Sequence, residues 1–310
     1  MHVNRRACLL GGASLLAASV TPATAQTPTP AFHRTKHGAF EIISVFDGYM
    51  DVAAAGAAAN KTDTEVDATL LAAGLPKSRI LQPINVTFVR TTSDLIAIDV
   101  GAGPNFLDGL GKLGDSMSAA GLDPKAVTKV LFTHGHPDHL WGAIDEFDDS
   151  IRFPNAQYMM AAVELDLWLS PDAATKLPTD RANFVPGARR NLTALKDKLS
   201  TFKPGQDVAP GIRAIDTAGH TQGHTSFEIA GPEPLVILGD ALIHPVISFA
   251  HPDWRPAADH EPDRAATMRK ALLDRLATDR ARILGYHLIR PGLGRVERKD
   301  AGYRFIAEGS

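Results

Sequence analysis

The chain has 310 residues, a single cysteine and a formal net charge of −3. This length can bury the core of one large domain. The slight acidity and the lack of a basic run argue against nucleic acid as a partner, and the cysteine at position 8 excludes a disulfide within the chain.

The first 25 residues are predicted to be a signal peptide rather than part of the fold. Paired arginines precede an apolar stretch, and residues 23–25 form a small-x-small cleavage site. The apolar stretch is too short to span a membrane, and no other run of the sequence qualifies as a transmembrane helix. The arginine pair favours twin-arginine export, with the general secretory route left open. We therefore expect a periplasmic or secreted protein, with residues 26–36 as a flexible leader and residues 37–310 as one domain.

The first half of this domain shows alternating strand and helix patterns. Strands are predicted at 40–46, 85–90, 95–100 and 129–132, and helices are predicted from about Asp63 and over 106–120. The strand at 40–46 is expected to end in an Asp47-Gly48 turn. The pattern is typical of a layered α/β domain.

The second half repeats this organisation. Strands are predicted at 153–160, 212–217, 226–230 and 235–240, and helices at 164–170, at 188–199 and within 257–277. The runs Leu95–Asp99 and Leu235–Asp240 are alike, since both are short apolar strands that end in an aspartate. We interpret them as corresponding strands of two α/β halves.

Residues 133–139, Thr-His-Gly-His-Pro-Asp-His, hold four metal-capable side chains directly after a predicted buried strand. Imidazole nitrogens and carboxylate oxygens are ligands that zinc and similar divalent metals accept. His134 and His136 would share one face of an extended segment. The proline then ends the strand and fits the first turn of a helix, so Asp138 and His139 can face a second metal position.

This run resembles the signature of the metallo-β-lactamase-fold hydrolases. The resemblance covers roughly residues 40–305 and implies a four-layered αββα sandwich. It also implies three further ligands in later segments. These match His220 in a Gly-His-Thr-x-Gly-His context, Asp240 at the end of an apolar strand, and His287 near the C-terminus.

The resemblance further implies two divalent metal ions per chain, with a hydroxide between them that attacks the substrate. The first ion would be held by His134, His136 and His220, and the second by Asp138, His139 and His287. Asp240 would bridge the two ions, and Asp138 and Asp240 would be the carboxylates of the catalytic centre. Zinc is the expected metal, although manganese, iron and cobalt fit the same donors.

Other polar residues near these motifs receive different assignments. We expect His224 to have a structural role, and Asp99 to stabilise the loop or support a ligand. The sequence leaves open whether His244 lines the site or is structural. His251 and His260 lie in a Pro/Asp-rich stretch, and we expect both on an exposed loop.

A narrower resemblance points to methyl parathion hydrolase-like enzymes. It is carried by four short segments at 153–156, 167–170, 287–294 and 302–305. In that group an aromatic cluster near the metals forms the leaving-group pocket, which the resemblance assigns here to Phe106, Trp168 and Phe184. We add His244 as a further candidate for the pocket wall.

These observations predict a metal-dependent hydrolase that cleaves a small, uncharged ester-type substrate. A lactone or aryl ester is the expected substrate, with an organophosphate triester as a further candidate. Alternatives are a β-lactamase, a thioesterase, or a metal-binding protein without hydrolytic activity. The sequence leaves a homodimer open.

Overall fold

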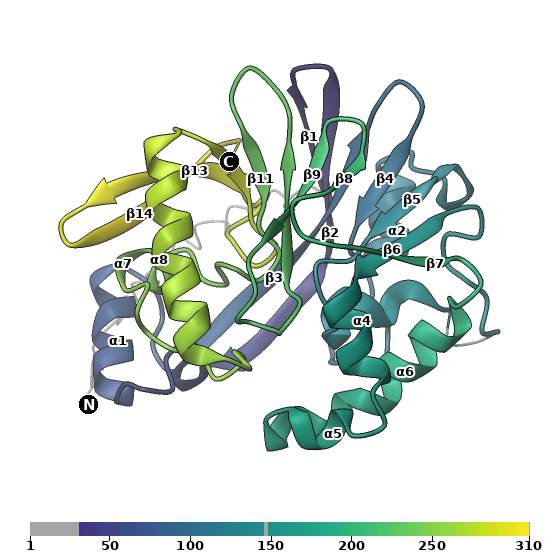
Figure 1. Cartoon of the computed structure of the whole chain (residues 1–310). Coiled ribbons are helices and arrows are strands. Elements are labelled where there is room, and N and C mark those ends of the chain that lie inside the picture. Colours follow the sequence, from purple (N-terminus) through teal and green to yellow (C-terminus); the bar gives the residue numbers. More distant parts are fainter. Residues whose placement is uncertain (1–30, 146–147, 310) are drawn as a thin grey trace, which may run out of the picture. The chain divides into compact units, whose positions relative to one another are not determined.

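Two seven-stranded sheets form the centre of the fold (Figure 1). The structure is a computed structural model, and it describes residues 31–145 and 148–309. The predicted signal peptide lies outside the described residues, so its assignment stays a prediction. Within the described part of the chain, no helix is both long and apolar enough to cross a membrane.

The first sheet contains the N-terminal strands in sequence order. Its members are β1 (Phe32–His37), β2 (Phe40–Ala53), β3 (Arg79–Arg90), β4 (Leu95–Ile98), β5 (Lys129–Leu131), β6 (Gln157–Ala161) and β7 (Leu199–Phe202). Neighbours from β1 to β4 are antiparallel, whereas those from β4 to β7 are parallel. The parallel part carries the predicted ligand segment, which follows β5.

The second sheet contains the remaining strands in the order β14 to β8. Its members are β8 (Asp207–Ala209), β9 (Ile212–Asp216), β10 (Thr225–Ile229), β11 (Leu235–Ile237), β12 (Arg282–Leu284), β13 (Leu293–Lys299) and β14 (Gly302–Ala307). Strands β11 and β12 are parallel, and the other neighbours are antiparallel.

Helices flank the outer faces of the two sheets. The α-helices are α1 (Asp63–Ala72), α2 (Leu113–Ala119), α3 (Pro137–Leu140), α4 (Ala162–Leu169), α5 (Ala173–Lys176), α6 (Val185–Ala194), α7 (Ile247–Ala250) and α8 (Pro262–Thr278). Short 3-10 helices are η1 (Ala54–Ala57), η2 (Pro124–Ala126), η3 (Trp141–Ala143) and η4 (Thr179–Phe184). Figure 1 shows α4 and α6 beside the first sheet and α8 beside the second.

Alternation along the strands divides the core into layers. Ile96 and Ile98 of β4 belong to a buried cluster that also contains Leu235 and Ile237 of β11, so this cluster lies between the sheets. Val236 instead packs in a cluster with residues of α8. Because these strands are buried on both faces, their sequences are continuously apolar. The predicted four-layered αββα sandwich is confirmed.

The predicted flexible leader is wrong over its last residues, because Phe32–His37 form β1. This strand pairs antiparallel with β2 through a two-residue loop of Gly38 and Ala39. Gly38 has a φ of 57°, which glycine adopts without strain and which tight hairpin loops require. The hairpin pairing with β2 gives this polar segment its order.

The predicted Asp47-Gly48 turn is instead a bulge within β2, where the register with β3 shifts. The Asp47 side chain is buried and accepts hydrogen bonds from the backbone N–H groups of Ala102 and Leu113, both at 2.8 Å. Burial raises the pKa of Asp47 to about 6, and these N–H groups oppose the shift. The bulge therefore anchors the loop that carries Phe106.

The predicted helix over 106–120 is confirmed only from Leu113 onward. Residues 106–112 form a loop in which Gly109 and Gly111 have φ values of 88° and 80°. A right-handed helix needs negative φ, so these two glycines favour the loop.

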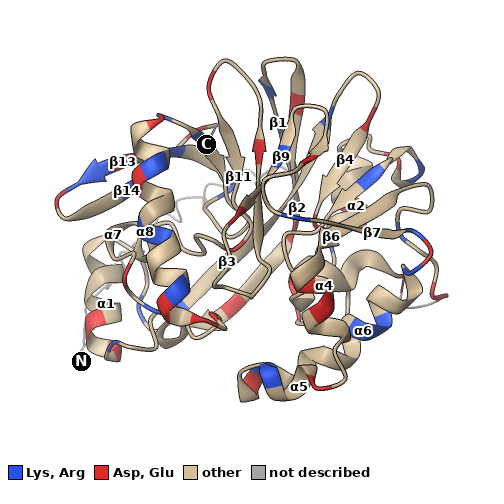
Figure 2. Cartoon of the chain, in the orientation of Figure 1, with Lys and Arg blue, Asp and Glu red and all other residues tan. Residues whose placement is uncertain are grey.

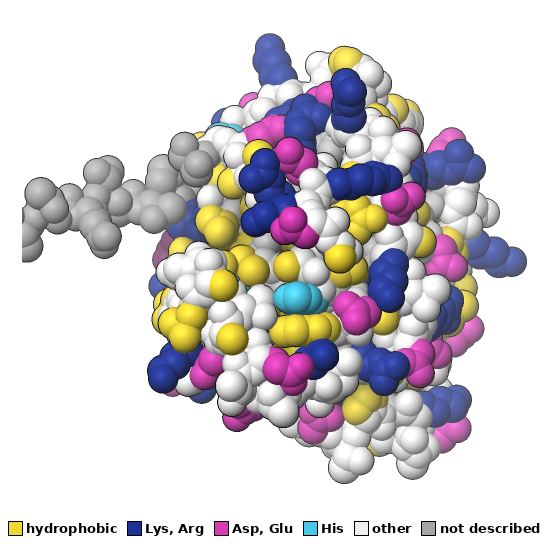
Figure 3. Space-filling view, turned by 90° about the vertical axis from the view of Figure 1, so that its left-hand side faces the viewer, with side chains coloured by type: hydrophobic (Ala, Val, Ile, Leu, Met, Phe, Trp, Pro, Cys, Tyr) yellow, Lys and Arg dark blue, Asp and Glu magenta, His cyan; other side chains and the backbone are white. Residues whose placement is uncertain are grey.

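Charged residues of both signs are interspersed along the described elements (Figure 2). On the face shown in Figure 3, hydrophobic side chains gather near the centre and charged side chains surround them. This surface mixes acidic and basic groups instead of separating them.

We predict that Asp47→Ala lowers the free energy of unfolding by about 2 to 4 kcal/mol, because two buried N–H groups lose their acceptor. Urea denaturation would measure the change. Asp51→Ala is the control, since Asp51 forms an exposed ion pair with Arg79; its effect should stay below about 1 kcal/mol. Equal losses in the two variants would contradict the anchoring role of Asp47.

Candidate metal centre

Loops that follow strands β5, β9, β11 and β12 bring the seven predicted ligands together, and all seven are buried. They form two groups, and within each group one candidate ligand atom per residue lies within 4.8 Å of the others. The first group contains His134, His136, His220 and Asp240, and the second contains Asp138, His139 and His287. Ligands far apart in sequence thus meet where strands of both sheets end.

Asp240 directs one carboxylate oxygen toward each group. Its Oδ2 lies 3.3 Å from Nε2 of His220, in the first group. Its Oδ1 lies 3.2 Å from Nε2 of His139 and 3.4 Å from Nε2 of His287, in the second group. This is the placement that a carboxylate shared by two cations requires.

Several of the converging atoms lack a hydrogen-bond partner among the described residues. They are His134 Nε2, Asp138 Oδ2, His139 Nε2 and Asp240 Oδ1. Buried polar atoms are nearly always paired, so four orphans in one place need an explanation. Two divalent cations would satisfy these nitrogen and oxygen atoms, and the mixed His/Asp set suits zinc or a similar metal. The residues present therefore fit a two-metal centre.

The charge distribution also favours cations. Burial lowers the pKa of His139, but the nearby carboxylates of Asp240, Asp138 and Asp99 raise it by more. The pKa of His287 is likewise raised to about 10, against the effect of burial and chiefly by Asp240 and Asp138. The buried carboxylates thus create a strongly negative environment.

Asp99 sets the orientation of His139, as the sequence suggested for a supporting residue. Its Oδ2 accepts from His139 Nδ1 at 2.8 Å, and its Oδ1 accepts from the backbone N–H of Thr133 at 2.8 Å. Because His139 donates from Nδ1 to Asp99, its Nε2 is the nitrogen that faces the metal centre. A carboxylate behind a histidine ligand fixes its tautomer in this way.

His224 lies outside both ligand groups. Its Nε2 accepts from the backbone N–H of Asp240 at 2.9 Å, and its Nδ1 lies 2.9 Å from Oγ1 of Thr217. Burial lowers the pKa of His224 to about 3, so the ring is neutral. This geometry matches the structural role predicted for His224, because the ring holds the backbone of Asp240.

The expectation that His260 lies on an exposed loop is wrong. Its Nε2 is 2.9 Å from Nε2 of His136, whose Nδ1 lies 3.0 Å from Nε2 of His220. The preceding residue, Asp259, accepts from Nδ1 of His220 at 3.1 Å and is bound through its other oxygen by the buried Arg269. Two consecutive residues therefore orient two histidines of the first group, which the Pro/Asp-rich composition did not reveal.

Glu164 of α4 is a further supporting residue that the sequence pattern did not reveal. It is fully buried, and its two oxygens accept four hydrogen bonds, from Gly135 N, Trp168 Nε1, Thr221 Oγ1 and Gly223 N. Burial raises its pKa, and the four donors oppose that shift. Glu164 thus ties the 133–139 segment to the loop of His220. The sequence feature that could have revealed this role is the position of Glu164, an acidic residue on the apolar face of a helix.

A cavity of about 210 Å³ opens over both ligand groups. Phe106 and Phe184 line it, with their ring centroids 5.9 Å apart. Trp141 extends this aromatic cluster, at 5.6 Å from the ring of Phe106. We call this cavity the aromatic pocket.

Trp168 does not line the aromatic pocket, contrary to the prediction from the resemblance. Its side chain is fully buried, donates to Oε1 of Glu164 at 2.7 Å and packs behind His136. The reason is Gly135, since a Cβ at that position would lie 2.2 Å from Nε1 of Trp168. The glycine lets the indole occupy the space behind the ligand segment.

His244, also predicted near the pocket, lines a different groove on the other side of His287. Its Nδ1 accepts hydrogen bonds from the backbone N–H groups of Val246 and Ile247, both at 3.1 Å. Burial lowers its pKa to about 4. The ring is therefore neutral at pH 7, with its proton on Nε2.

Comparison with known proteins gives the family. The family model of the Metallo-beta-lactamase superfamily matches residues 79–287 of this chain, a range that includes all seven predicted ligands. The chain belongs to the metallo-beta-lactamase superfamily. The predicted superfamily is thereby confirmed, whereas the narrower kinship with methyl parathion hydrolase-like enzymes stays a prediction.

Two solved members of this fold are similar over nearly their whole length. AidC, a dizinc quorum-quenching lactonase in complex with a product, shares 29% identity with a TM-score of 0.85, covering 90% of this chain and 98% of its own. The hydrolase AbOPH of the beta-lactamase superfamily shares 27% identity with a TM-score of 0.85. The match covers 92% of this chain and 99% of AbOPH. An uncharacterized protein of Mycobacterium leprae (strain TN) is 24% identical over 186 residues, 57% of this chain and 76% of its own.

We predict that Asp240→Ala loses at least one metal and lowers turnover by more than about a hundredfold, because a shared ligand matters more than the residues that support ligands. Elemental analysis of dialysed protein and steady-state kinetics would measure both effects. Asp207→Ala, an exposed change on β8, should leave both unchanged. An undiminished metal content in Asp240→Ala would rule out the shared-ligand role.

We also predict a pH effect from His244. Below its ordinary value of 6.5 the unfolded chain binds a proton that the folded protein does not accept until about pH 4. The free energy of unfolding therefore falls between these values, by about 2 kcal/mol for this group from pH 7 to pH 5. His244→Asn, which keeps an acceptor for the backbone N–H groups, should reduce that pH-dependent loss by about 2 kcal/mol in urea unfolding. An identical loss in both proteins would contradict the assignment.

Proposed function

We propose that this chain is a dinuclear metal-dependent hydrolase of uncharged ester-type bonds, with a lactone as its substrate. The observation that carries the proposal is the placement of Asp240 beneath the aromatic pocket, with one oxygen toward each ligand group. The family supports a metal-dependent hydrolase, and the similarity to AidC supports a lactone.

When bound, two divalent metal ions would lower the pKa of water to near neutrality and polarise the carbonyl oxygen of the substrate. His134, His136 and His220 would hold one ion. Asp138, His139 and His287 would hold the other. Asp240 would join them. Hydrolysis adds water across the ester bond, so a lactone gives a hydroxy acid.

The protein itself holds the candidate ligands in fixed positions. Asp99 and Asp259 accept from the outer nitrogens of two candidate ligand histidines, and His260 contacts the outer nitrogen of a third, so each ring keeps its other nitrogen toward the centre. Glu164 and His224 fix the loops and the backbone from which the ligands project. Such preorganised ligands need no rearrangement during the reaction.

The aromatic pocket supports an uncharged substrate. Its walls include Met50, Val52, Phe106, Phe184 and Ile243. Arg181 is the single arginine or lysine among the described residues that line it. Arg181 lies over the ring of Phe184, at 5.5 Å from its centroid. Outside the metal centre, one cation on an otherwise apolar wall offers little to bind further negative charge, whereas a neutral ester needs no such partner.

A second candidate activity is cleavage of an aryl phosphotriester. The cluster of Phe106, Trp141 and Phe184 favours it, because edge-to-face aromatic contacts would accept an aryl leaving group. The narrower resemblance to methyl parathion hydrolase-like enzymes points the same way.

We also propose that the protein is exported through a signal peptide at residues 1–25.

A paired assay tests the substrate class. Zinc-loaded protein lacking residues 1–25 would be given N-hexanoyl homoserine lactone, a dimethyl aryl phosphotriester, a β-lactam and a thioester. We expect the highest kcat/KM for the lactone. The ranking of the four substrates by kcat/KM should be the same at every zinc concentration that supports activity. A preference for the phosphotriester would select the second candidate, and a preference for the β-lactam or thioester would contradict both.

We predict that Phe106→Ala raises the KM for aryl substrates by about tenfold while zinc content and kcat for a small aliphatic lactone stay constant. The change removes an aromatic wall worth roughly 1 to 3 kcal/mol in a hydrophobic pocket. An unaltered KM for aryl substrates would mean that Phe106 does not contact the leaving group.

A further inference from the structure

Tyr286, the residue before the last candidate ligand, contacts the two other residues of the second ligand group. Its hydroxyl donates to the backbone oxygen of Asp138 at 2.7 Å. Its ring stacks on that of His139, with the ring centroids 3.9 Å apart and the planes inclined by 24°. Because His287 is its neighbour in the chain, one buried side chain connects all three residues of this group.

The helix that carries Asp138 and His139 needs such external contacts. It is α3, a single turn of four residues. A helix of one turn is not stable in water by itself, and its last carbonyl groups have no partner within the helix. The Tyr286 hydroxyl provides a partner for one of these, the carbonyl of Asp138, and the stacked ring restricts the orientation of His139.

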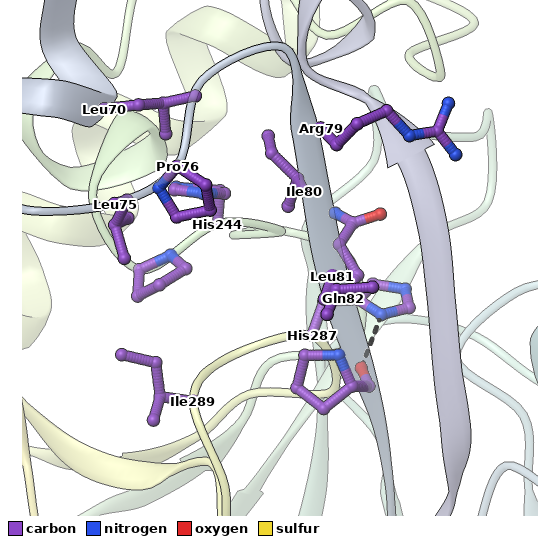
Figure 4. A pocket seen from close by; sticks show the side chains of 12 residues that line it. Leu70, Leu75, Pro76, Arg79, Ile80, Leu81, Gln82, His244, His287 and Ile289 are labelled. Atoms are coloured by element: carbon purple, nitrogen blue, oxygen red, sulfur yellow. Dashed lines mark hydrogen bonds between the residues drawn. The ribbon is translucent and has the colours of Figure 1, made fainter. Parts of the chain in front are cut away.

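Strand β3 in turn holds the loop that carries Tyr286 and His287. The backbone N–H of Asn85 donates to the backbone oxygen of Tyr286 at 2.9 Å. Its buried side-chain amide donates to the backbone oxygens of Tyr286 and Leu288, both at 2.9 Å. Nδ1 of His287 donates to the backbone oxygen of Pro83 at 3.0 Å (Figure 4). Since β3 belongs to the first sheet and the loop follows β12 of the second, the second ligand group is assembled across the two sheets.

The first ligand group receives support from a different part of the chain. His220 contacts Asp259, which is bound by the buried Arg269. His136 contacts His260. These supports lie within residues 259–269, far in sequence from both β3 and the loop of Tyr286. A change in one set of supports can therefore affect one ligand group and spare the other.

We propose that Tyr286 is a positioning residue for the metal ion of the second group, with Asn85 holding it in place from β3. Tyr286 fixes α3 against the loop of His287, so that the three ligands converge on one position. The inference rests on the two-metal centre of the proposed function. It assigns separate supports to the two ions, so that each ion can be weakened without the other.

The test measures zinc binding to the metal-free protein against a competing chelator, which gives one dissociation constant for each of the two ions. Tyr286→Phe removes the hydroxyl but keeps the stacked ring, and it should raise one of these constants about tenfold. Tyr286→Leu removes both contacts and should raise the same constant about a hundredfold, the upper end of the effect expected for residues that support ligands. The other constant should change by less than about threefold in both variants.

Tyr158→Phe is the matched control. Tyr158 is also a buried tyrosine, its hydroxyl donates to the backbone oxygen of Phe153, and its ring stacks on that of Phe132. Because these contacts involve no candidate ligand, Tyr158→Phe should leave both dissociation constants unchanged. If Tyr286→Leu does not fold, the comparison of Tyr286→Phe with Tyr158→Phe decides the question.

Two further variants test the separate supports. Asn85→Ala changes a residue that contacts no ligand side chain, and it should weaken the same ion as Tyr286→Leu because it loosens the same loop. Asp259→Asn should weaken the other ion, since Asp259 orients His220. Equal weakening of both ions by Tyr286→Leu, or no change in either constant, would overturn the proposal.

Anomalous diffraction from crystals with one equivalent of zinc identifies the ion that each variant retains. We expect zinc on the first group in Tyr286→Leu and on the second group in Asp259→Asn. Zinc retained on the second group in Tyr286→Leu would overturn the proposal. Because zinc binding requires no turnover, a wild type that binds two zinc ions but opens no lactone would remove the proposed function and leave this inference in place. A wild type that binds no zinc would overturn both.

Discussion

Three buried carboxylates, Asp99, Asp138 and Asp240, lie close to one another among the histidines, and this arrangement is the constraint on which the structure depends. Burying so much negative charge is unfavourable unless each oxygen is bound or neutralised. Asp99 is satisfied by His139 and Thr133, whereas one oxygen of Asp138 and one of Asp240 lack partners among the described residues. The unsatisfied oxygens and imidazole nitrogens converge, and a pair of cations is the group that completes them.

The αββα sandwich makes this convergence possible. Each sheet supplies short strands whose ends deliver candidate ligands, while the helices cover the outer faces. The ligand loops are long and irregular, so their geometry depends on hydrogen bonds from behind. Glu164 joins two of these loops, and Asp259, held by Arg269, fixes His220. Loss of such a support would disturb the ligands without touching the substrate.

Sequence spacing predicted the four metal-capable residues of the 133–139 run and a layered α/β fold, because strand-then-ligand patterns are local. The other three candidate ligands and the αββα arrangement were implied by the family resemblance. It could not predict Glu164, Asp259 and His260, since their partners are distant in sequence and no local pattern marks them. Trp168 and Trp141 illustrate the same limit. Gly135 leaves room for the indole of Trp168 behind the ligand segment, and Trp141 joins the aromatic cluster instead. The Asp47-Gly48 pair fits a turn as well as a bulge, and only the pairing of β2 with β3 distinguishes the two.

The central claim is that two metal ions on these seven residues drive hydrolysis of an ester-type bond. The most direct measurement is a titration of metal-free protein with zinc, with bound zinc and opening of N-hexanoyl homoserine lactone followed together. The account predicts no turnover without zinc and a plateau of activity at two bound ions per chain. Turnover by the metal-free protein, or a second ion that binds without any effect on the rate, would contradict it.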